Sequence, residues 1–404
     1  MASKYRYLIP ITAVIVFIVV KLPHLSYPFF WDESWPYVSA VHSMYRNGPS
    51  LMPGAIESEL SRGHPLLFHF LAASWMKVFG TSHTAMHSFS LVVAVLMLVL
   101  VWYIAQKLFN ESVALFAMVM IACQQVFFVQ STFLLPEVLL ALVAVAGIYL
   151  YIIQRFLLTA IALVLLLYTK ESGVIVVFVL GVDAVLKLFF KGSLKAKAYR
   201  LISVVVPVLL MALFFVLQRR IYGWYLFPVH VQLVSFDWDT FYNKFRAGIK
   251  FLFRDDYRKY FFLLLSLLSL VAMGIKRDRR YGAVLLMVPF VYLLCSDDHH
   301  ALLPSQILLP LFAASIIAAV YLFLKGAGTD RLASSFVLLN TAFIICFCIF
   351  SSVNFFTSRY LLIVLIPLLL IAAFMYWYYI NAINRRLLIP GLAIVLVLGI
   401  AGMK

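Results

Sequence analysis

The chain has 404 residues, of which 65% are apolar and only 12% charged. This composition excludes a water-soluble globular domain, because soluble domains average about 25% charged residues. The formal net charge is +16, which in so apolar a chain indicates basic loops beside a membrane rather than nucleic-acid binding.

Apolar runs of membrane-spanning length recur from end to end. They predict an all-α, polytopic membrane protein with about 11–13 transmembrane helices. No small-residue cleavage site follows the first run, so we expect an uncleaved span rather than a signal peptide. The predicted spans are residues 7–23, 84–106, 112–130, 135–153, 156–169, 173–190, 201–218, 260–275, 281–295, 303–324, 332–351, 360–380 and 387–403.

Alternation of these spans places the N-terminus and most basic loops on one side of the bilayer. That side holds more than half of the 32 lysine and arginine residues, and the positive-inside rule makes it cytoplasmic. Two long loops, residues 24–83 and 219–259, then face outward. The sequence shows no internal repeat, so we expect one integral membrane domain over residues 1–404, in the inner (plasma) membrane.

Within the second long loop, residues 241–260 mix aromatic with basic side chains. This pattern is typical of a helix that lies in the membrane interface. Two interpretations stay open: the helix anchors the chain to lipid headgroups, or it attracts an anionic lipid substrate.

The stretch FFWDESWPY places two adjacent carboxylates, Asp32 and Glu33, among aromatic residues just after the first span. One interpretation makes Asp32 the N-cap of a helix over residues 33–46. The other places a carboxylate in a cleft at the membrane surface, where partial desolvation raises its pKa toward that of a useful general base. The two residues can divide these roles.

The stretch SRGHPLLFHF places Arg62 and His64 before Pro65, at the start of a helix expected over residues 66–79. Cationic groups beside a helix N-terminus suit an anion such as phosphate. The alternative for His64 is an ordinary surface histidine.

Three further charged residues lie at helix ends or interrupt an apolar run. Glu137 follows Pro136 in the first turn of a helix, where the helix dipole favours a carboxylate. Lys170 and Glu171 interrupt the apolar run of residues 156–190, which predicts a helical hairpin with its tip at residues 169–173. Two interpretations stay open: Lys170 binds a lipid phosphate, or the Lys170–Glu171 tip is open to water.

The outer loops also contain groups that suit a divalent metal ion. His230 lies in the second long loop, and the stretch SDDHHALLP, residues 296–304, combines carboxylates with imidazoles. These residue types bind divalent metals, although their spacing here is generic.

Arg359 and Tyr360 open a late helix from the outer side. An arginine at that depth can hold a phosphate through two hydrogen bonds, or it can extend to water from the interface. Asp183 lies inside a span, four residues before Lys187, which predicts an ordinary i, i+4 ion pair.

Five motifs occur in a characteristic order: the Asp-Glu pair, the HPL turn, the acidic residue after a proline, the TK tip and the RYLL helix start. In this order they resemble a GT-C membrane glycosyltransferase of the protein-mannosyltransferase type, similar to bacterial aminoarabinose transferases. The resemblance covers nearly all of the chain. It implies a multi-span bundle with amphipathic helices at residues 33–47 and 64–79, a sugar donor on a polyprenyl monophosphate, and inverting transfer to an extracytoplasmic lipid, glycan or protein acceptor.

The resemblance also implies roles for individual residues. Asp32 matches the catalytic aspartate, as general base toward, or orienter of, the acceptor hydroxyl. Glu33 beside it is the second catalytic candidate, and acceptor contact, a metal ligand or a place in the first helical turn stay open for it. The remaining assignments are donor-phosphate binding by Arg62, His64, Lys170 and Arg359, and substrate binding by Glu137, Glu171 and Tyr360.

Some positions depart from the family pattern. A leucine, Leu66, replaces the second proline of the turn, and Glu137 stands where many relatives have aspartate. In the aminoarabinose enzymes a carboxylate beside the turn and a later histidine hold a metal. His230 matches that histidine, but Gly63 stands where the carboxylate would be, so metal dependence is left open.

Two other functions are compatible with a polytopic membrane chain. A transporter or lipid flippase for a lipid-linked glycan favours charged or broken helices at mid-membrane and often an internal repeat. A lipid-binding assembly protein would explain the basic outer helix but not the cluster around Asp32.

Overall fold

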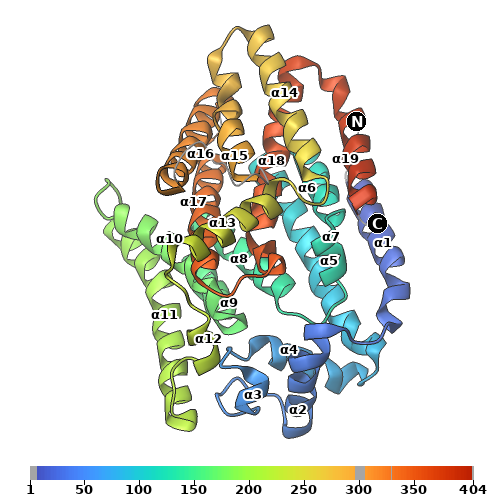
Figure 1. The fold of residues 1–404 in the computed structure, drawn as a ribbon, viewed down its shortest axis with the longest axis vertical. Coiled ribbons are helices and arrows are strands. Elements are labelled where there is room, and N and C mark those ends of the chain that lie inside the picture. Colours follow the sequence, from blue (N-terminus) through green and yellow to red (C-terminus); the bar gives the residue numbers. More distant parts are fainter. Residues whose placement is uncertain (1–6, 296–304, 329, 403–404) are drawn as a thin grey trace. The chain divides into compact units, whose positions relative to one another are not determined.

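The computed structural model describes residues 7–295, 305–328 and 330–402 (Figure 1). Every regular element in these ranges is a helix. The chain divides into two compact units: unit 1 comprises residues 1–100 and 126–233, and unit 2 comprises residues 101–125 and 234–404.

Unit 1 contains the candidate site residues of the two long loops. Its helices pack side by side. Helix α9 packs against α8 and α11, α10 packs against α11, and α2 packs against α4. The helices are α1 (Leu8–Lys21), α2 (Ser39–Asn47), α3 (Ser58–Ser61), α4 (Leu67–Phe79), α5 (His83–Leu108, which continues into unit 2), α7 (Gln125–Gln130), α8 (Glu137–Ile152), α9 (Phe156–Thr169), α10 (Val174–Leu186), α11 (Leu194–Tyr222) and α12 (Pro228–Gln232).

Unit 2 packs around α18, whose residues are almost all buried. Helices α6, α14 and α17 contact α18, and α13 contacts α17. The helices are α6 (Glu111–Ala122), α13 (Trp238–Phe253), α14 (Arg258–Lys276), α15 (Val288–Cys295), α16 (Ser305–Ala327), α17 (Arg331–Val353), α18 (Leu362–Ile383) and α19 (Leu388–Gly402).

Seven helices in the described ranges are long and apolar enough to cross a membrane. Four shorter apolar helices, of 10–17 residues, accompany them. The predicted class, an all-α multi-pass membrane protein, is confirmed. The seven are Leu8–Ser26, His83–Leu108, Leu194–Tyr222, Arg258–Lys276, Gln306–Ala327, Arg331–Val353 and Ser358–Ile383.

Two predicted spans are interrupted. Residues 112–130 form α6 and α7 with a break at Cys123–Gln124, where the Gln124 side-chain oxygen accepts a hydrogen bond from the buried Arg258 (2.8 Å). Residues 281–295 form a 3-10 helix, η6 (Arg279–Leu286), followed by the short α15. Helix α15 begins just before Pro289, a residue that favours a helix start and disfavours helical continuation through it.

The first long loop begins differently from the predicted helix over residues 33–46. Asp32 lies inside a 3-10 turn, η3 (Trp31–Glu33), and a distorted turn, η4 (Ser34–Val38), precedes α2. The N-cap position of η3 is Phe30, and the Glu33 carboxylate accepts its N–H (3.3 Å). The capping interpretation of Asp32 is therefore wrong, and Glu33 supplies the local hydrogen bond. The predicted pair of Asp183 and Lys187 is confirmed at 2.7 Å.

Candidate functional site

The two carboxylates of the first loop lie in different environments. Glu33 is 1% exposed and Asp32 is half-buried. Because a 3-10 helix has about three residues per turn, consecutive side chains project about 120° apart. Glu33 therefore points into the protein, while its neighbour projects from another side of the same turn.

Glu33 connects the first loop to the segment before α8. Its Oε1 accepts a hydrogen bond from the Leu134 N–H (2.7 Å) and lies 2.8 Å from His87 Nε2. His87 comes from the start of α5 and is 2% exposed. Leu134 lies three residues before Glu137, so Glu33 also fixes the approach to that carboxylate.

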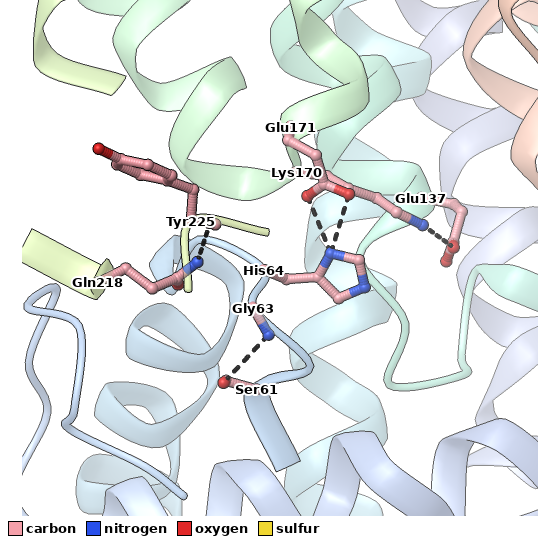
Figure 2. Close-up of polar contacts among 8 residues, drawn as sticks. All are labelled: Ser61, Gly63, His64, Glu137, Lys170, Glu171, Gln218 and Tyr225. Atoms are coloured by element: carbon pink, nitrogen blue, oxygen red, sulfur yellow. Dashed lines mark hydrogen bonds and ion pairs between the residues drawn. The ribbon is translucent and has the colours of Figure 1, made fainter. Parts of the chain in front are cut away.

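His64 and Glu171 form an ion pair between the turn before α4 and the break between α9 and α10 (Figure 2). His64 Nδ1 lies 2.8 Å from Oε2 and 3.1 Å from Oε1 of Glu171. Because a carboxylate only accepts, Nδ1 donates, and Nε2 is left on the far side of the ring. Burial raises the pKa of Glu171, but the charge and hydrogen bond of His64 and the charge of Lys170 lower it more, to about 2.

Lys170 and Glu137 form a second pair beside the first (Figure 2). Lys170 Nζ lies 3.4 Å from Glu137 Oε1, and both side chains are almost fully buried. The predicted break at Lys170 and Glu171 is confirmed, because α9 ends at Thr169 and α10 begins at Val174. Of the two charged side chains at this tip, Lys170 is only 7% exposed, whereas Glu171 is 34% exposed and reaches water.

The second long loop packs against the first at Gly63. This residue has φ +72°, and a Cβ placed there would lie 2.9 Å from the Trp224 ring and 3.2 Å from the backbone nitrogen of Phe227. Only glycine combines that conformation with so close an approach. On the α11 side, Gln218 Nε2 donates to the Tyr225 carbonyl (2.6 Å) and holds the start of this loop (Figure 2).

This packing brings His230 beside His64, with ring centroids 5.0 Å apart. Burial and the nearby charge of His64 are the main causes that lower the pKa of His230, to about 4. Glu171 opposes this shift, and Arg62 and Lys170 add smaller decreases. His230 is therefore a neutral imidazole at physiological pH.

The donor set does not match a metal centre. In the part of the chain that the structure describes, no group of three or more His, Cys, Asp or Glu side chains is arranged to hold a metal ion. His64 already uses Nδ1 for Glu171, and Gly63 offers no ligand. The role of His230 as a metal ligand stays a prediction, and the stretch at residues 296–304 lies outside the described residues.

The other predicted cations differ in their surroundings. Arg62 is half-buried, adopts a left-handed conformation (φ 49°) at the end of α3, and makes no ion pair within the described ranges. Arg359 lies in unit 2, on the 3-10 helix η7 (Ser358–Leu361), with its guanidinium 5.2 Å from the ring centroid of Tyr360. The roles predicted for Arg359 and Tyr360 stay predictions.

His87 and Leu134 were missed from the sequence, although both contact Glu33. A signal for His87 was available, because an imidazole at the start of a long apolar helix is costly unless it is paired. Leu134 acts through its backbone N–H, which no sequence pattern identifies.

Residues 63–214 match the model of the dolichyl-phosphate-mannose-protein mannosyltransferase family. This match confirms the predicted family resemblance. The matched range begins at the Gly63 contact and contains His64, Glu137, Lys170 and Glu171, the four residues of the two ion pairs. No curated protein matches the chain significantly.

Two crystal structures of ArnT from Cupriavidus metallidurans are similar to this chain. The apo structure has 15% sequence identity and a TM-score of 0.47, over 91% of this chain and 77% of that one. The structure bound to undecaprenyl phosphate has 14% identity and a TM-score of 0.47, over 94% and 78%. At this level of similarity no residue role is transferred from them.

Proposed function

We propose that this chain is a membrane glycosyltransferase that moves a sugar from a polyprenyl-monophosphate donor to an acceptor on the extracytoplasmic side. One observation carries the proposal: the family match coincides with the network of His64–Glu171 and Lys170–Glu137 pairs. The family transfers mannose from dolichyl phosphate to protein, which supplies the reaction type. The network supplies the charged groups that the reaction needs.

The donor phosphate is held by the turn before α4. Arg62 has no ion pair within the described ranges, so its guanidinium can bind a phosphate through two hydrogen bonds without losing another partner. His64 offers Nε2, because Glu171 fixes its other nitrogen. Lys170 is neutralised by Glu137, so it contributes less net positive charge than its formal charge predicts.

Asp32 acts as general base toward the acceptor hydroxyl. The hydroxyl oxygen forms a bond to the anomeric carbon, its proton passes to Asp32, and the bond from that carbon to the phosphate oxygen breaks. The leaving group departs with both electrons of that bond as polyprenyl phosphate. Attack opposite the leaving group inverts the anomeric configuration. Arg62 and His64 stabilise the charge that develops on the phosphate.

Several features of the proposal concern the cellular setting. We place the protein in the inner membrane as one integral domain, with its site outside the cytoplasm and membrane lipids around it. The acceptor is a glycolipid, a polysaccharide or a protein.

Mass spectrometry of lipid-linked sugars and envelope glycans, in cells with and without this chain, tests the proposal. Loss of one glycan modification together with accumulation of its polyprenyl-phosphate sugar is expected. Sugar transfer by the purified protein in detergent distinguishes the alternative. A transporter or flippase only moves its substrate across a membrane, so it would show no sugar transfer in detergent, whereas a glycosyltransferase would. Absence of transfer with every polyprenyl-phosphate sugar found to accumulate would contradict the proposal.

A further inference from the structure

Glu33 and His87 form a buried pair at which four segments of unit 1 meet. The imidazole connects α5 to the residues after α1, because His87 Nδ1 lies 3.0 Å from the Leu25 carbonyl oxygen. The carboxylate adds the turn at Phe30 and the segment at Leu134. Neither side chain is more than 2% exposed.

The hydrogen bonds determine how protons are distributed. A carbonyl oxygen only accepts, so His87 Nδ1 carries a hydrogen that it donates to Leu25. One further proton is shared between His87 Nε2 and Glu33 Oε1, which lie 2.8 Å apart. The pair is neutral overall whichever atom holds that proton, which removes the cost of burying a net charge.

Both oxygens of Glu33 face donors of the protein itself. Oε1 accepts from Leu134 and faces His87, and Oε2 accepts from Phe30. With the side chain fully buried, no oxygen is left for an acceptor hydroxyl. This geometry does not suit the catalytic role predicted for Glu33 alongside Asp32.

We propose that Glu33 and His87 are positioning residues, which hold Asp32 at a fixed place relative to the segment leading to Glu137. The inference rests on the proposed function for the role of Asp32. Glu33 is adjacent to Asp32 in η3, and its partner Leu134 lies three residues before Glu137. The pair therefore fixes the base and the start of α8 through one carboxylate.

Two substitutions of Glu33 distinguish positioning from catalysis. In Glu33→Gln the amide oxygen still accepts from Leu134 and from His87 as its Nε2–H tautomer. The variant loses the hydrogen bond to Leu25 and the one from Phe30, whose N–H then faces the amide NH2. In Glu33→Asp the carboxylate is one methylene shorter and cannot reach both partners. Positioning predicts that Glu33→Gln stays within about 10-fold of the wild-type kcat, while Glu33→Asp falls by about 100-fold.

A base at Glu33 predicts the reverse order, since aspartate keeps a carboxylate and glutamine does not. An Asp variant as active as the Gln variant, or more active, would overturn the proposal. The KM for the donor should stay within about two-fold in both variants, because the change acts on the alignment of Asp32 rather than on phosphate binding.

A second comparison keeps the test decisive if Glu33→Asp does not fold. His87→Ala removes the proton source and leaves a buried carboxyl that must ionise alone or take up a proton. Adding Glu33→Gln removes that problem. We expect His87→Ala to lower kcat by about 100-fold and the double variant to recover at least 10-fold. A double variant no more active than His87→Ala would overturn the proposal.

Thermal unfolding of the same detergent-solubilised variants separates this proposal from the proposed function. A wild-type protein without transfer activity would refute the function alone. The unfolding temperatures then test the pair. Glu33→Gln should have a higher unfolding temperature than Glu33→Asp, and the double variant a higher one than His87→Ala. The opposite orders would show that the pair does not hold these segments together.

Discussion

Gly63→Ala should destabilise unit 1 and displace the loop that carries His230. The left-handed conformation costs a residue with a Cβ about 1–2 kcal/mol. The new methyl group would also meet the Trp224 ring at 2.9 Å and the Phe227 backbone nitrogen at 3.2 Å. Overpacking of this kind costs about 1–3 kcal/mol, so the total is about 2–5 kcal/mol.

Gly223→Ala is the matched control. It has a similar φ of +84° at the end of α11, but a Cβ there meets nothing within 4 Å. It should cost only the conformational term, about 1–2 kcal/mol. Thermal unfolding in detergent measures the difference, at about 2–4 °C per kcal/mol for a unit of this size. Equal losses in the two variants would refute the close contact between the two loops.

Three further predictions concern the charged groups. The pKa of Glu171 is lowered to about 2, so the Glu171 carboxylate stabilises the fold at neutral pH. Glu171→Gln should therefore be less stable than the wild type by a constant amount above about pH 4.5, and this difference should vanish as the pH falls toward 2. Thermal unfolding across pH measures the difference, and a pH-independent difference would contradict the prediction. Lys170→Met should destabilise the protein by about 3–5 kcal/mol, since it leaves the Glu137 carboxylate buried without that cation. Adding Glu137→Gln should recover part of this loss. A double variant less stable than Lys170→Met would refute the pair. Arg62→Ala should change the free energy of unfolding by no more than about 0.5 kcal/mol but raise the KM for the lipid-linked donor, and an unchanged KM would remove Arg62 from the site.

The helical membrane class could be predicted because apolar runs and their lengths are properties of the local sequence. Helix α9 has the bounds predicted for it, Phe156–Thr169. The interruptions at Gln124 and before Pro289 were not predicted as breaks. The first depends on Arg258, which lies more than one hundred residues away in the chain, and hydrophobic periodicity does not report such contacts.

The candidate site was predicted by residue type but not by partnership. The sequence identified Lys170 and Glu171 as charges that interrupt an apolar run, and they lie in the break between α9 and α10. It did not reveal that they pair with Glu137 and His64 respectively. These pairs join segments about 30 and 100 residues apart, so only the fold determines them.

The two carboxylates of the first loop illustrate the same limit. As neighbours in FFWDESWPY they have similar chemistry, and the sequence alone left both as catalytic candidates. The turn of η3 separates them, since it directs Glu33 toward His87 and Leu134. Burial and backbone partners, which sequence patterns do not contain, therefore divide their roles.

The most direct test of the central claim is sugar transfer by Asp32→Asn. Purified wild-type and variant proteins in lipid vesicles would receive a polyprenyl-phosphate-linked sugar, and the rate of transfer to the acceptor would be measured in a single turnover. Loss of the general base predicts a rate lower by about 10²–10⁴-fold, with donor binding and unfolding temperature unchanged. A variant that transfers sugar at the wild-type rate would contradict the account.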